Sequence, residues 1–454
     1  MNMSAGKTLH DQYKNKLVTA AEAVRVVKNG DTVWYGTFNG QPVDCDKALA
    51  ARKDELSNVI IQSAGALPPA PQVALVDPNH EHFAYHSWYF TALDRALCDM
   101  GNVFYCTINY HECKKVVEEL GKNDVAILQV APMDEHGFFN FGPNASHHHS
   151  VSMSVNNLIV EVNSTIPRCL GGFGEGVHIS DVDYIVEGGN TPIFEYPPNV
   201  NPSPNEEKIA AYVVNLIEDR SCIQVGIGGL PASVSHLIAQ SDIKDLGVHS
   251  EMFIDSFVDL IESGKINGKY KNLDRGKINY TFSIATRKTY DFMNNNPMLA
   301  SCPGHYTNDP KIICQNDKVV AVNNAVELDL YSQVCAESYG TRQISGTGGQ
   351  LDFMQGAFES KGGKSFICMT STRKDKSGNL VSRIKPHLQQ GAIVTTPRSV
   401  VQYVVTENGI VMLKGKSTWE RAEALISIAH PMFQDELVHE AEKMGIWKKS
   451  NKSE

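Results

Sequence analysis

Short runs of β-branched and other apolar residues recur along most of the chain, with helical stretches between many of them. Runs of this kind are typical of strands, and they span residues 58–65, 125–133, 157–163, 183–187, 318–330, 366–372 and 403–413. Helical spacing of apolar residues predicts a helix over 418–430. Because alternating strands and helices favour parallel sheets covered by helices, the sequence predicts an α/β fold with mostly parallel sheets.

Two segments share one pattern, which indicates an internal duplication. AAEAVRVVKNGDTVWYGTFNG begins at Ala20, and IAAYVVNLIEDRSCIQVGIGG begins at Ile209. Each predicts a helix, a break, a short apolar strand and a turn containing glycine, and Gly36 aligns with Gly226. A proline-rich stretch lies between them and reads as an extended linker. We therefore predict an N-terminal domain over 1–195, a linker over 196–208 and a C-terminal domain over 209–454.

Composition and charge argue against several classes of protein. The 454 residues carry a net charge of -10 without a run of Lys or Arg, which argues against a nucleic-acid-binding protein. The 10 cysteines form no C-x-x-C pair, so neither a zinc motif nor a compact disulfide framework is indicated. The N-terminus lacks the apolar segment of a signal peptide, and no run approaches the roughly 18 apolar residues of a membrane span. We expect a cytoplasmic protein that has no membrane partner.

Two glycine-rich loops are candidates for ligand binding. QVGIGGLPASV, residues 224–234, runs from an apolar strand through Gly226, Gly228 and Gly229 toward a helix. SGTGGQLDFMQGA, residues 345–357, is a second glycine loop that enters an apolar helix. Backbone N–H groups beside a helix start can stabilise a phosphate or a developing oxyanion. The alternative is that each loop is a tight turn without a ligand.

A single carboxylate stands in an apolar stretch, GVHSEMF, residues 247–253. Glu251 has no Lys or Arg inside that stretch, and an unpaired buried carboxylate is costly. It follows a predicted strand, so it is expected at the carboxyl end of the sheet, where ligands of α/β proteins bind. A structural role within that crevice is the alternative. His249 could act as a general base, although a structural histidine is the more common case.

Three consecutive histidines, His147 to His149, raise the question of a metal site. Neighbouring residues point in different directions, so all three are not expected to reach one ion. We expect a loop or the start of a helix at this position and no bound metal.

The combination of GIGGLP, GVHSEM, SGTGGQLDF and VTTPRSVVQYVVTENGIVMLKGKS resembles the class I coenzyme A transferases. Within them the chain is most similar to the acetyl-CoA hydrolase/transferase family, particularly its butyryl-CoA:acetate and 4-hydroxybutyrate CoA-transferase members. The resemblance covers nearly the whole chain. It implies two similar open α/β domains with the active site in the cleft between them.

The resemblance also implies roles for individual residues. Glu251 matches the glutamate that forms a glutamyl-CoA thioester, in a ping-pong reaction between a short-chain acyl-CoA and a carboxylate acceptor. The positions that match coenzyme A contacts are Gly226, Ile227, Gly228, Gly229, Leu230, Val326 and Gly349. Coenzyme A and acyl-CoA are then substrates, with no permanently bound cofactor, and a homo-oligomer is expected. A carboxylate nucleophile is ionised at neutral pH and needs no general base, but desolvation of Glu251 in an apolar setting would raise its pKa, so we expect the site to supply a donor such as a backbone N–H. We also expect His249 and Ser250 to position Glu251.

The acyl pocket is expected to come from the N-terminal half. Asn39, Gln41 and Asn140 are candidates for holding a carboxylate, and Phe38, Phe139 and Phe141 could surround a short alkyl chain or simply pack in the core. Two other functions stay open. An acyl-CoA hydrolase would admit water to the glutamyl thioester, and a non-catalytic metabolite sensor would not need Glu251.

Overall fold

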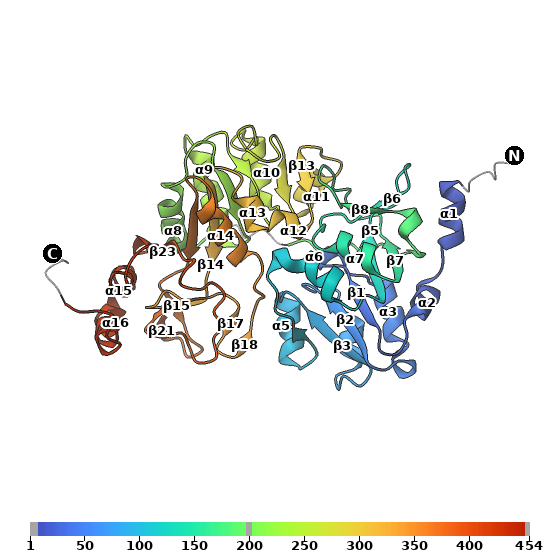
Figure 1. Cartoon of the computed structure of the whole chain (residues 1–454), viewed down its shortest axis with the longest axis horizontal. Helices are drawn as coiled ribbons and strands as arrows, with labels where there is room; N and C mark the ends of the chain where they lie inside the picture. Colours follow the sequence, from blue (N-terminus) through green and yellow to red (C-terminus); the bar gives the residue numbers. More distant parts are fainter. Residues whose placement is uncertain (1–7, 197–201, 450–454) are drawn as a thin grey trace. The chain divides into compact units, whose positions relative to one another are not determined.

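The computed structural model describes residues 8–196 and 202–449, which form two compact units (Figure 1). Unit 1 comprises Met1–Pro197 together with Asn279–Thr307, and unit 2 comprises Pro198–Ile278 together with Asn308–Glu454. The chain therefore returns to unit 1 for one later segment. The sequence-based domain prediction, by contrast, contains only continuous segments.

Unit 1 is built on a seven-stranded sheet in the order β4-β3-β2-β1-β5-β7-β9, in which every neighbouring pair is parallel. Its strands are β1 Thr32–Tyr35, β2 Val59–Ser63, β3 Phe83–Ser87, β4 Phe104–Tyr105, β5 Val125–Val130, β7 Asn157–Val162 and β9 Tyr184–Glu187. The helices include α1 Leu9–Lys16, α2 Ala20–Ala23, α3 Asp44–Ala50, α4 Gln72–Val76, α5 Ala92–Asp99, α6 Cys113–Lys115, α7 His148–Ser154, α11 Arg287–Met293 and α12 Gly304–Thr307. Apolar side chains from both faces of this sheet form two buried clusters.

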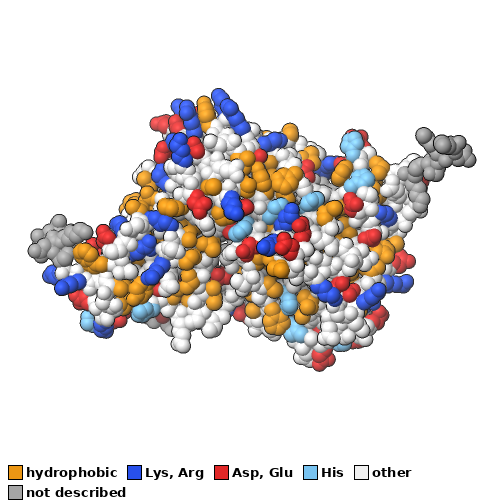
Figure 2. Space-filling view, viewed as in Figure 1, with side chains coloured by type: hydrophobic (Ala, Val, Ile, Leu, Met, Phe, Trp, Pro, Cys, Tyr) orange, Lys and Arg blue, Asp and Glu red, His pale blue; other side chains and the backbone are white. Residues whose placement is uncertain are grey.

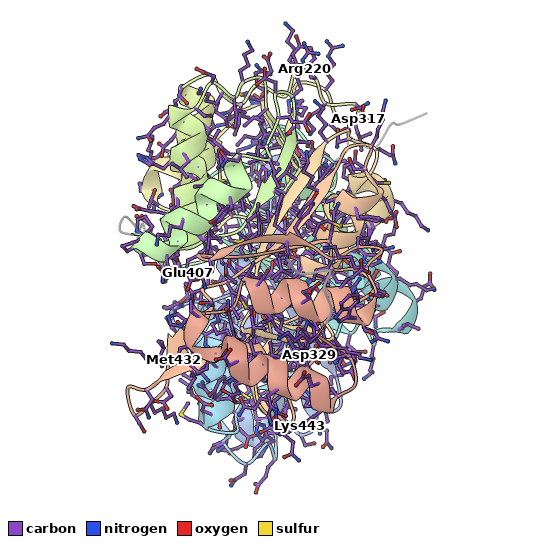
Figure 3. The ribbon with its side chains drawn as sticks, turned by 90° about the vertical axis from the view of Figure 1, so that its left-hand side faces the viewer. Arg220, Asp317, Asp329, Glu407, Met432 and Lys443 are labelled. Atoms are coloured by element: carbon purple, nitrogen blue, oxygen red, sulfur yellow. The ribbon has the colours of Figure 1, made fainter. Side chains whose placement is uncertain are left out.

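Unit 2 contains a six-stranded sheet in the order β11-β10-β14-β19-β23-β24. Its strands are β10 Cys222–Val225, β11 Gly247–Val248, β14 Val319–Asn324, β19 Lys364–Cys368, β23 Tyr403–Thr406 and β24 Gly409–Met412, and β24 alone is antiparallel to its neighbour. The helices are α8 Pro204–Val214, α9 Gly229–Gln240, α10 Asp255–Glu262, α13 Pro310–Ile313, α14 Gln350–Glu359, α15 Thr418–Ser427 and α16 Pro431–Lys443. Figure 3 shows α16, with Met432 near its start and Lys443 at its end.

The predicted α/β class with mostly parallel sheets is confirmed, and two predicted strands divide in the structure. The 403–413 run folds back as a hairpin because Glu407 and Asn408 form a two-residue turn between the paired residues Thr406 and Gly409. In the 318–330 run, the first strand, β14, ends at Asn324. The second part of the run forms β15 Glu327–Asp329. This strand joins a separate three-stranded sheet with β16 Val334–Cys335 and β22 Ile384–Lys385.

The predicted linker is partly helical. Its residues 197–201 lie outside the described part of the chain, but α8 begins at Pro204. Proline is favoured in the first helical turn, where its missing N–H has no intrahelical partner anyway. Ser203 completes the start, because its hydroxyl accepts from the N–H of Glu206 while Glu206 accepts from Ser203 in return.

The two sheets place their first strands in similar positions. In unit 1, β1 lies between β2 and β5, and in unit 2, β10 lies between β11 and β14. The strand order reverses direction beside each of these first strands. In open α/β sheets such a reversal creates a crevice outside the carboxyl ends of the strands, where ligands bind. This common position supports the duplication inferred from the sequence.

The surface mixes charges of both signs. Figure 2 shows Lys and Arg side chains among Asp and Glu side chains over the face in view. Within residues 8–196 and 202–449, no helix is both long and apolar enough to cross a membrane.

A buried glutamate caps the N-terminus of α3 in unit 1. Glu161, on β7, is only 2% exposed. Its carboxylate accepts from the backbone N–H groups of Val43, Asp44 and Cys45 at 2.8, 3.0 and 2.7 Å. Helix α3 has no side-chain cap of its own, so Glu161 satisfies the N–H groups that the first turn leaves without partners.

We predict that Glu161→Ala lowers the stability of the protein by about 2–4 kcal/mol, because three N–H groups lose a charged acceptor in a buried site. The unfolding midpoint in urea, followed by circular dichroism, measures this. Glu119→Ala, which removes an exposed carboxylate in the same unit, is the control and should change the midpoint little. Equal midpoints for the two variants would contradict the capping role.

Candidate active site

Most of the predicted site residues of unit 2 follow the carboxyl ends of three neighbouring parallel strands. Gly226 follows β10, Glu251 comes three residues after β11, and Val326 comes two residues after β14. The register pairs Ile223 with Val248, so Gly226 and Glu251 each come three residues after this pair. Because the strands run in parallel, all of these residues lie at one edge of the sheet, where its strand order reverses.

The Glu251 side chain is held by two groups from other parts of unit 2. The amide Nδ2 of Asn308 donates to Oε2 of Glu251 at 2.5 Å. The backbone N–H of Gly349, at the start of α14, donates to the same carboxyl group. A Cβ atom on Gly349 would overlap both Oε2 of Glu251 and Nδ2 of Asn308, so only glycine fits this contact.

Burial raises the pKa of Glu251 from its ordinary value of 4.5 to about 7. The negative charge of Asp352, one turn into α14, raises this pKa further. The hydrogen bonds from Asn308 and Gly349 favour the charged form and lower the pKa. Burial thus raises this pKa as the apolar surroundings of Glu251 in the sequence led us to expect, and the N–H of Gly349 is a backbone donor of the kind expected there.

The loop between β10 and α9 exposes its backbone to an open space. Nothing lies within 4 Å of a Cβ built on Gly226 or on Gly228. Gly228 has a φ of 122°, which side chains other than glycine rarely tolerate. Gly229 begins α9, and its Cβ would come within 2.5 Å of Oε1 of Glu206, so the Glu206 carboxylate would have to move to admit another residue. The first part of the loop is thus free to approach a ligand, whereas Gly229 and the buried Leu230 secure the helix start.

Two residues near Glu251 were not identified from the sequence. Asn308 is fully buried, and its Oδ1 has no hydrogen-bond partner within the described part of the chain. No motif singles it out, since it precedes Asp309 and Pro310, an ordinary helix start. Asp352 carried a weak signal, because it stands three residues after Gly349 in the first turn of an otherwise apolar helix.

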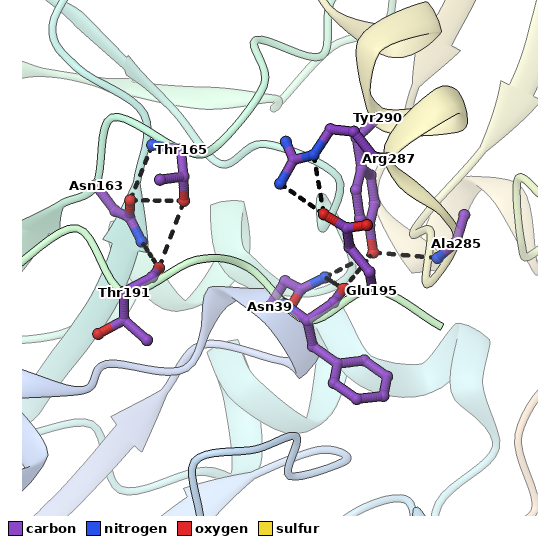
Figure 4. Close-up of polar contacts among 9 residues, drawn as sticks. Asn39, Asn163, Thr165, Thr191, Glu195, Ala285, Arg287 and Tyr290 are labelled. Carbon is purple, nitrogen blue, oxygen red and sulfur yellow. Dashed lines mark hydrogen bonds and ion pairs between the residues drawn. The ribbon is translucent and has the colours of Figure 1, made fainter. Parts of the chain in front are cut away.

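Two of the three polar candidates in unit 1 have structural partners. Asn39 donates to Oη of Tyr290 at 2.9 Å and accepts from the N–H of Phe194 at 2.8 Å (Figure 4). Asn140 donates to the carbonyl of Cys169 and accepts from its N–H, at 2.8 and 2.9 Å. These bonds occupy both amides, which explains their burial without a substrate carboxylate.

The third candidate, Gln41, lines a small cavity of about 20 Å³ in unit 1 together with Phe38 and Gln129. Its buried Oε1 has no hydrogen-bond partner among the described residues. The cavity lies where β1 and β5 end, at the strand-order reversal of unit 1. Phe38 stacks on Phe282 at 4.3 Å between ring centroids.

The other two aromatic candidates belong to the core. Phe139 and Phe141 are fully buried in one of the two hydrophobic clusters of unit 1. Their surroundings account for them as packing residues.

The three histidines mark the start of a helix, as expected. Helix α7 begins at His148, with His147 just before it. Nε2 of His148 accepts from the N–H of Thr37 at 2.7 Å, and burial lowers the pKa of His147 to about 3. Throughout the described ranges, no group of three His, Cys, Asp or Glu side chains is arranged to hold a metal ion.

The arrangement around Glu251 can perform covalent chemistry. A carboxylate that is partly removed from water is a competent nucleophile when ionised. Backbone N–H groups at the start of α14 and in the open glycine loop could stabilise the oxyanion that forms as it attacks a carbonyl.

Most of the chain matches one known protein family. Residues 1–195 match the acetyl-CoA hydrolase/transferase N-terminal domain, and residues 285–441 match the C-terminal domain of the same family. The chain is 48% identical to the butyryl-CoA:acetate CoA-transferase of Anaerostipes caccae, over 97% of this chain and 99% of that protein.

Solved structures agree with the sequence comparison. RipA from Yersinia pestis superimposes with a TM-score of 0.88 at 35% identity, covering 97% of this chain and all (100%) of the other. The 4-hydroxybutyrate CoA-transferase of Porphyromonas gingivalis superimposes with a TM-score of 0.79 at 31% identity, covering 96% of this chain and 100% of that one. The chain therefore belongs to the acetyl-CoA hydrolase/transferase family.

Proposed function

We propose that this protein transfers coenzyme A from butyryl-CoA to acetate, with Glu251 as the nucleophile and a glutamyl-CoA thioester as the covalent intermediate. The observation that carries the proposal is the carboxyl group of Glu251 held at the sheet edge by Asn308 and Gly349. The 48% identity to a full-length butyryl-CoA:acetate CoA-transferase supports the choice of substrates.

In the first half-reaction, the Glu251 carboxylate attacks the thioester carbonyl of butyryl-CoA. The C–S bond breaks, coenzyme A leaves as a thiolate, and a butyryl-glutamyl anhydride remains. The thiolate then attacks the glutamyl carbonyl and expels butyrate, which leaves coenzyme A attached to Glu251 as a thioester. No proton has to move in either step, so a general base is not required.

In the second half-reaction, acetate attacks the glutamyl thioester and releases the thiolate again. The thiolate attacks the acetyl carbonyl of the resulting anhydride, which yields acetyl-CoA and restores the Glu251 carboxylate. Every step develops negative charge on a carbonyl oxygen. We assign its stabilisation to N–H groups of the loop at Gly226, Ile227 and Gly228, and of Gly349, each worth about 3–4 kcal/mol when well aligned.

The chemistry at Glu251 accounts for the surroundings of the residue. Partial removal from water makes the carboxylate a stronger nucleophile but also favours its neutral form. Asn308 and Gly349 offset that effect by donating hydrogen bonds to the charged form. Ser250 is fully buried next to Glu251, and its role in positioning remains a prediction.

We further propose that the protein works in the cytoplasm, since all ten of its cysteines are free thiols, as a reducing compartment would keep them. Self-association into a homo-oligomer also stays a prediction, which sedimentation velocity can check.

Because only the ionised carboxylate attacks, we predict that kcat/KM for butyryl-CoA rises with pH through about 7, the pKa of Glu251. The value at pH 6 should be about tenfold below that at pH 8. Asn308→Ala removes a donor that favours the charged form, so its midpoint should move to higher pH. Initial rates measured from pH 6 to pH 8 for the wild type and for Asn308→Ala test this prediction. A constant kcat/KM from pH 6 to pH 8 would contradict the raised pKa of Glu251.

We predict that Gly349→Ala lowers kcat by about 100-fold or more, because the added methyl group displaces Glu251 from its reactive position. The φ of Gly349 is -94°, which alanine adopts readily, so the backbone is not strained. The thermal midpoint of the variant should therefore stay close to that of the wild type. A variant with normal kcat would show that Glu251 needs no such contact.

The covalent intermediate can be trapped directly. Incubation with butyryl-CoA followed by borohydride should reduce the glutamyl thioester, and peptide mass spectrometry should then find Glu251 alone modified. Glu251→Ala should lose both the modification and acetyl-CoA formation. Unmodified Glu251 in a sample that turns over would refute the mechanism. Release of more than one butyrate per protein molecule in the absence of added acetate would instead identify a hydrolase.

A further inference from the structure

A buried glutamate that the mechanism above does not use lies beside the second glycine loop of unit 2. Glu337 is only 3% exposed. It directly precedes a short hairpin, β17 Ser338–Tyr339 with β18 Arg342–Gln343, and the loop 344–349 runs from this hairpin to α14. The labels β17, β18 and α14 mark this part of unit 2 in Figure 1. The loop supplies the N–H group that contacts the proposed nucleophile, so whatever holds the loop also fixes that contact.

Glu337 contacts the loop along most of its length. Its carbonyl accepts from the N–H groups of Ile344 and Ser345 at 2.9 and 3.2 Å. Its carboxylate accepts from Oγ1 of Thr347 and from Nε2 of Gln343, both at 3.4 Å. The same Gln343 amide donates to the carbonyl of Ser345 at 2.7 Å. A single residue thus holds the loop from its first residue to within two residues of its last glycine.

The far end of the loop is held by a second set of bonds, which two consecutive threonines connect to the first set. Thr395 donates from its hydroxyl to Oε1 of Glu337 at 3.0 Å. Thr396 donates from its hydroxyl to Oε1 of Gln350, the first residue of α14, at 2.9 Å. Nε2 of Gln350 in turn donates to the carbonyl of Asn324, at the end of β14, at 2.7 Å. The last glycine of the loop is therefore fixed from both sides.

The partners of the Glu337 carboxylate are unusual for a buried acidic side chain. All of those in the described part of the chain are neutral hydroxyl or amide groups. A buried carboxylate without a cation costs stability, and an apolar side chain of similar size would cost less. The loop, however, contains three glycines and so offers few side chains by which the core can hold it. A carboxylate can accept from several donors at once, and this capacity explains its presence here.

We propose that Glu337 is a positioning residue, which holds the loop 344–349 so that the N–H of Gly349 points at the carboxylate of Glu251. The inference rests on the proposed function in one respect, since it takes Glu251 as the nucleophile. The effect of Glu337 is indirect, because it acts through Gly349. The N–H of Gly349 both orients the nucleophile and favours its charged form.

The first test measures the titration of Glu251 in the protein without substrate. Carbon NMR of protein labelled at the glutamate carboxyl carbons follows it, and the signal that is absent from Glu251→Gln identifies the residue. In Glu337→Ala the loop is released and the N–H contact weakens, so the pH midpoint should rise by about 0.5–1 unit. Loss of the Glu337 charge alone would lower the midpoint, because a nearby negative charge raises the pKa of a carboxyl group. The sign of the shift therefore separates positioning from a direct electrostatic effect, and Asp352 is the same in every variant.

Matched variants separate the contact from the stability of the fold. Glu337→Gln keeps an acceptor oxygen and nearly the same shape, so its pH midpoint should stay close to that of the wild type. Thr347→Val removes the loop's side of the contact without emptying the buried site. It should raise the midpoint in the same direction, and it tests the proposal even if Glu337→Ala folds poorly. The control is Asp329→Ala, which removes another buried carboxylate of unit 2 and should lower the thermal midpoint without moving the titration of Glu251.

Turnover of butyryl-CoA with acetate gives the second readout. In Glu337→Ala, kcat at the high-pH limit should fall about tenfold, because a displaced donor stabilises the oxyanion less well. Glu337→Gln should recover most of this loss. An unchanged pH midpoint in both Glu337→Ala and Thr347→Val would overturn the proposal, and so would a midpoint that falls. Failure of the proposed function looks different, since the wild type would then transfer no coenzyme A while the titration still reports on the contact at Glu251.

Discussion

The contact between Glu251 and the start of α14 is the constraint on which the rest of the site depends. A carboxyl group enclosed to this degree needs donors, and Asn308 and the N–H of Gly349 supply them. The contact requires that residue 349 has no side chain. It also requires that β11 ends where it does and that α14 begins where it does. The folding of unit 2 thus serves to bring these two chain segments together at one sheet edge.

Enclosure of Glu251 has opposite consequences for reactivity and for charge. Less water around the carboxylate favours attack on a carbonyl, yet it raises the pKa to about 7 and leaves part of the protein in the neutral, unreactive form near neutrality. Asp352 increases this tendency, and the two hydrogen bonds limit it. The balance among these four groups, rather than Glu251 alone, determines how much of the carboxyl group is ionised at a given pH.

The two units share a topology but carry different residues at the point where strand order reverses. Each has its first strand beside the point where strand order reverses. In unit 2 that point carries an open glycine loop and the carboxylate of Glu251. In unit 1 it carries a small cavity lined by Phe38, Gln41 and Gln129. Duplication of an α/β unit explains the shared position, while the residues that follow the strands explain the difference.

Alternating strands and helices in the sequence were enough to predict the α/β class, because period-2 and helical spacing are local properties. The turn at Glu407-Asn408 could also have been predicted locally, because asparagine favours turns. The start of α8 at Pro204, by contrast, was hidden by the usual association of proline with linkers.

In the candidate site, likewise, some residues could be identified from the sequence and others only from the structure. Glu251 and the glycine loops stand out in the sequence, since a lone carboxylate in an apolar run and repeated glycines are unusual there. Asn308, 57 residues from Glu251, has no such signal, and only folding brings its amide to the carboxylate. Likewise Asn39 and Asn140 resembled ligand-binding residues until their backbone and side-chain partners were known. The sequence by itself determined the fold class and singled out Glu251 as an unusual carboxylate, but the tertiary structure decided the direction in which its pKa shifts, because desolvation and hydrogen bonding depend on groups distant along the chain.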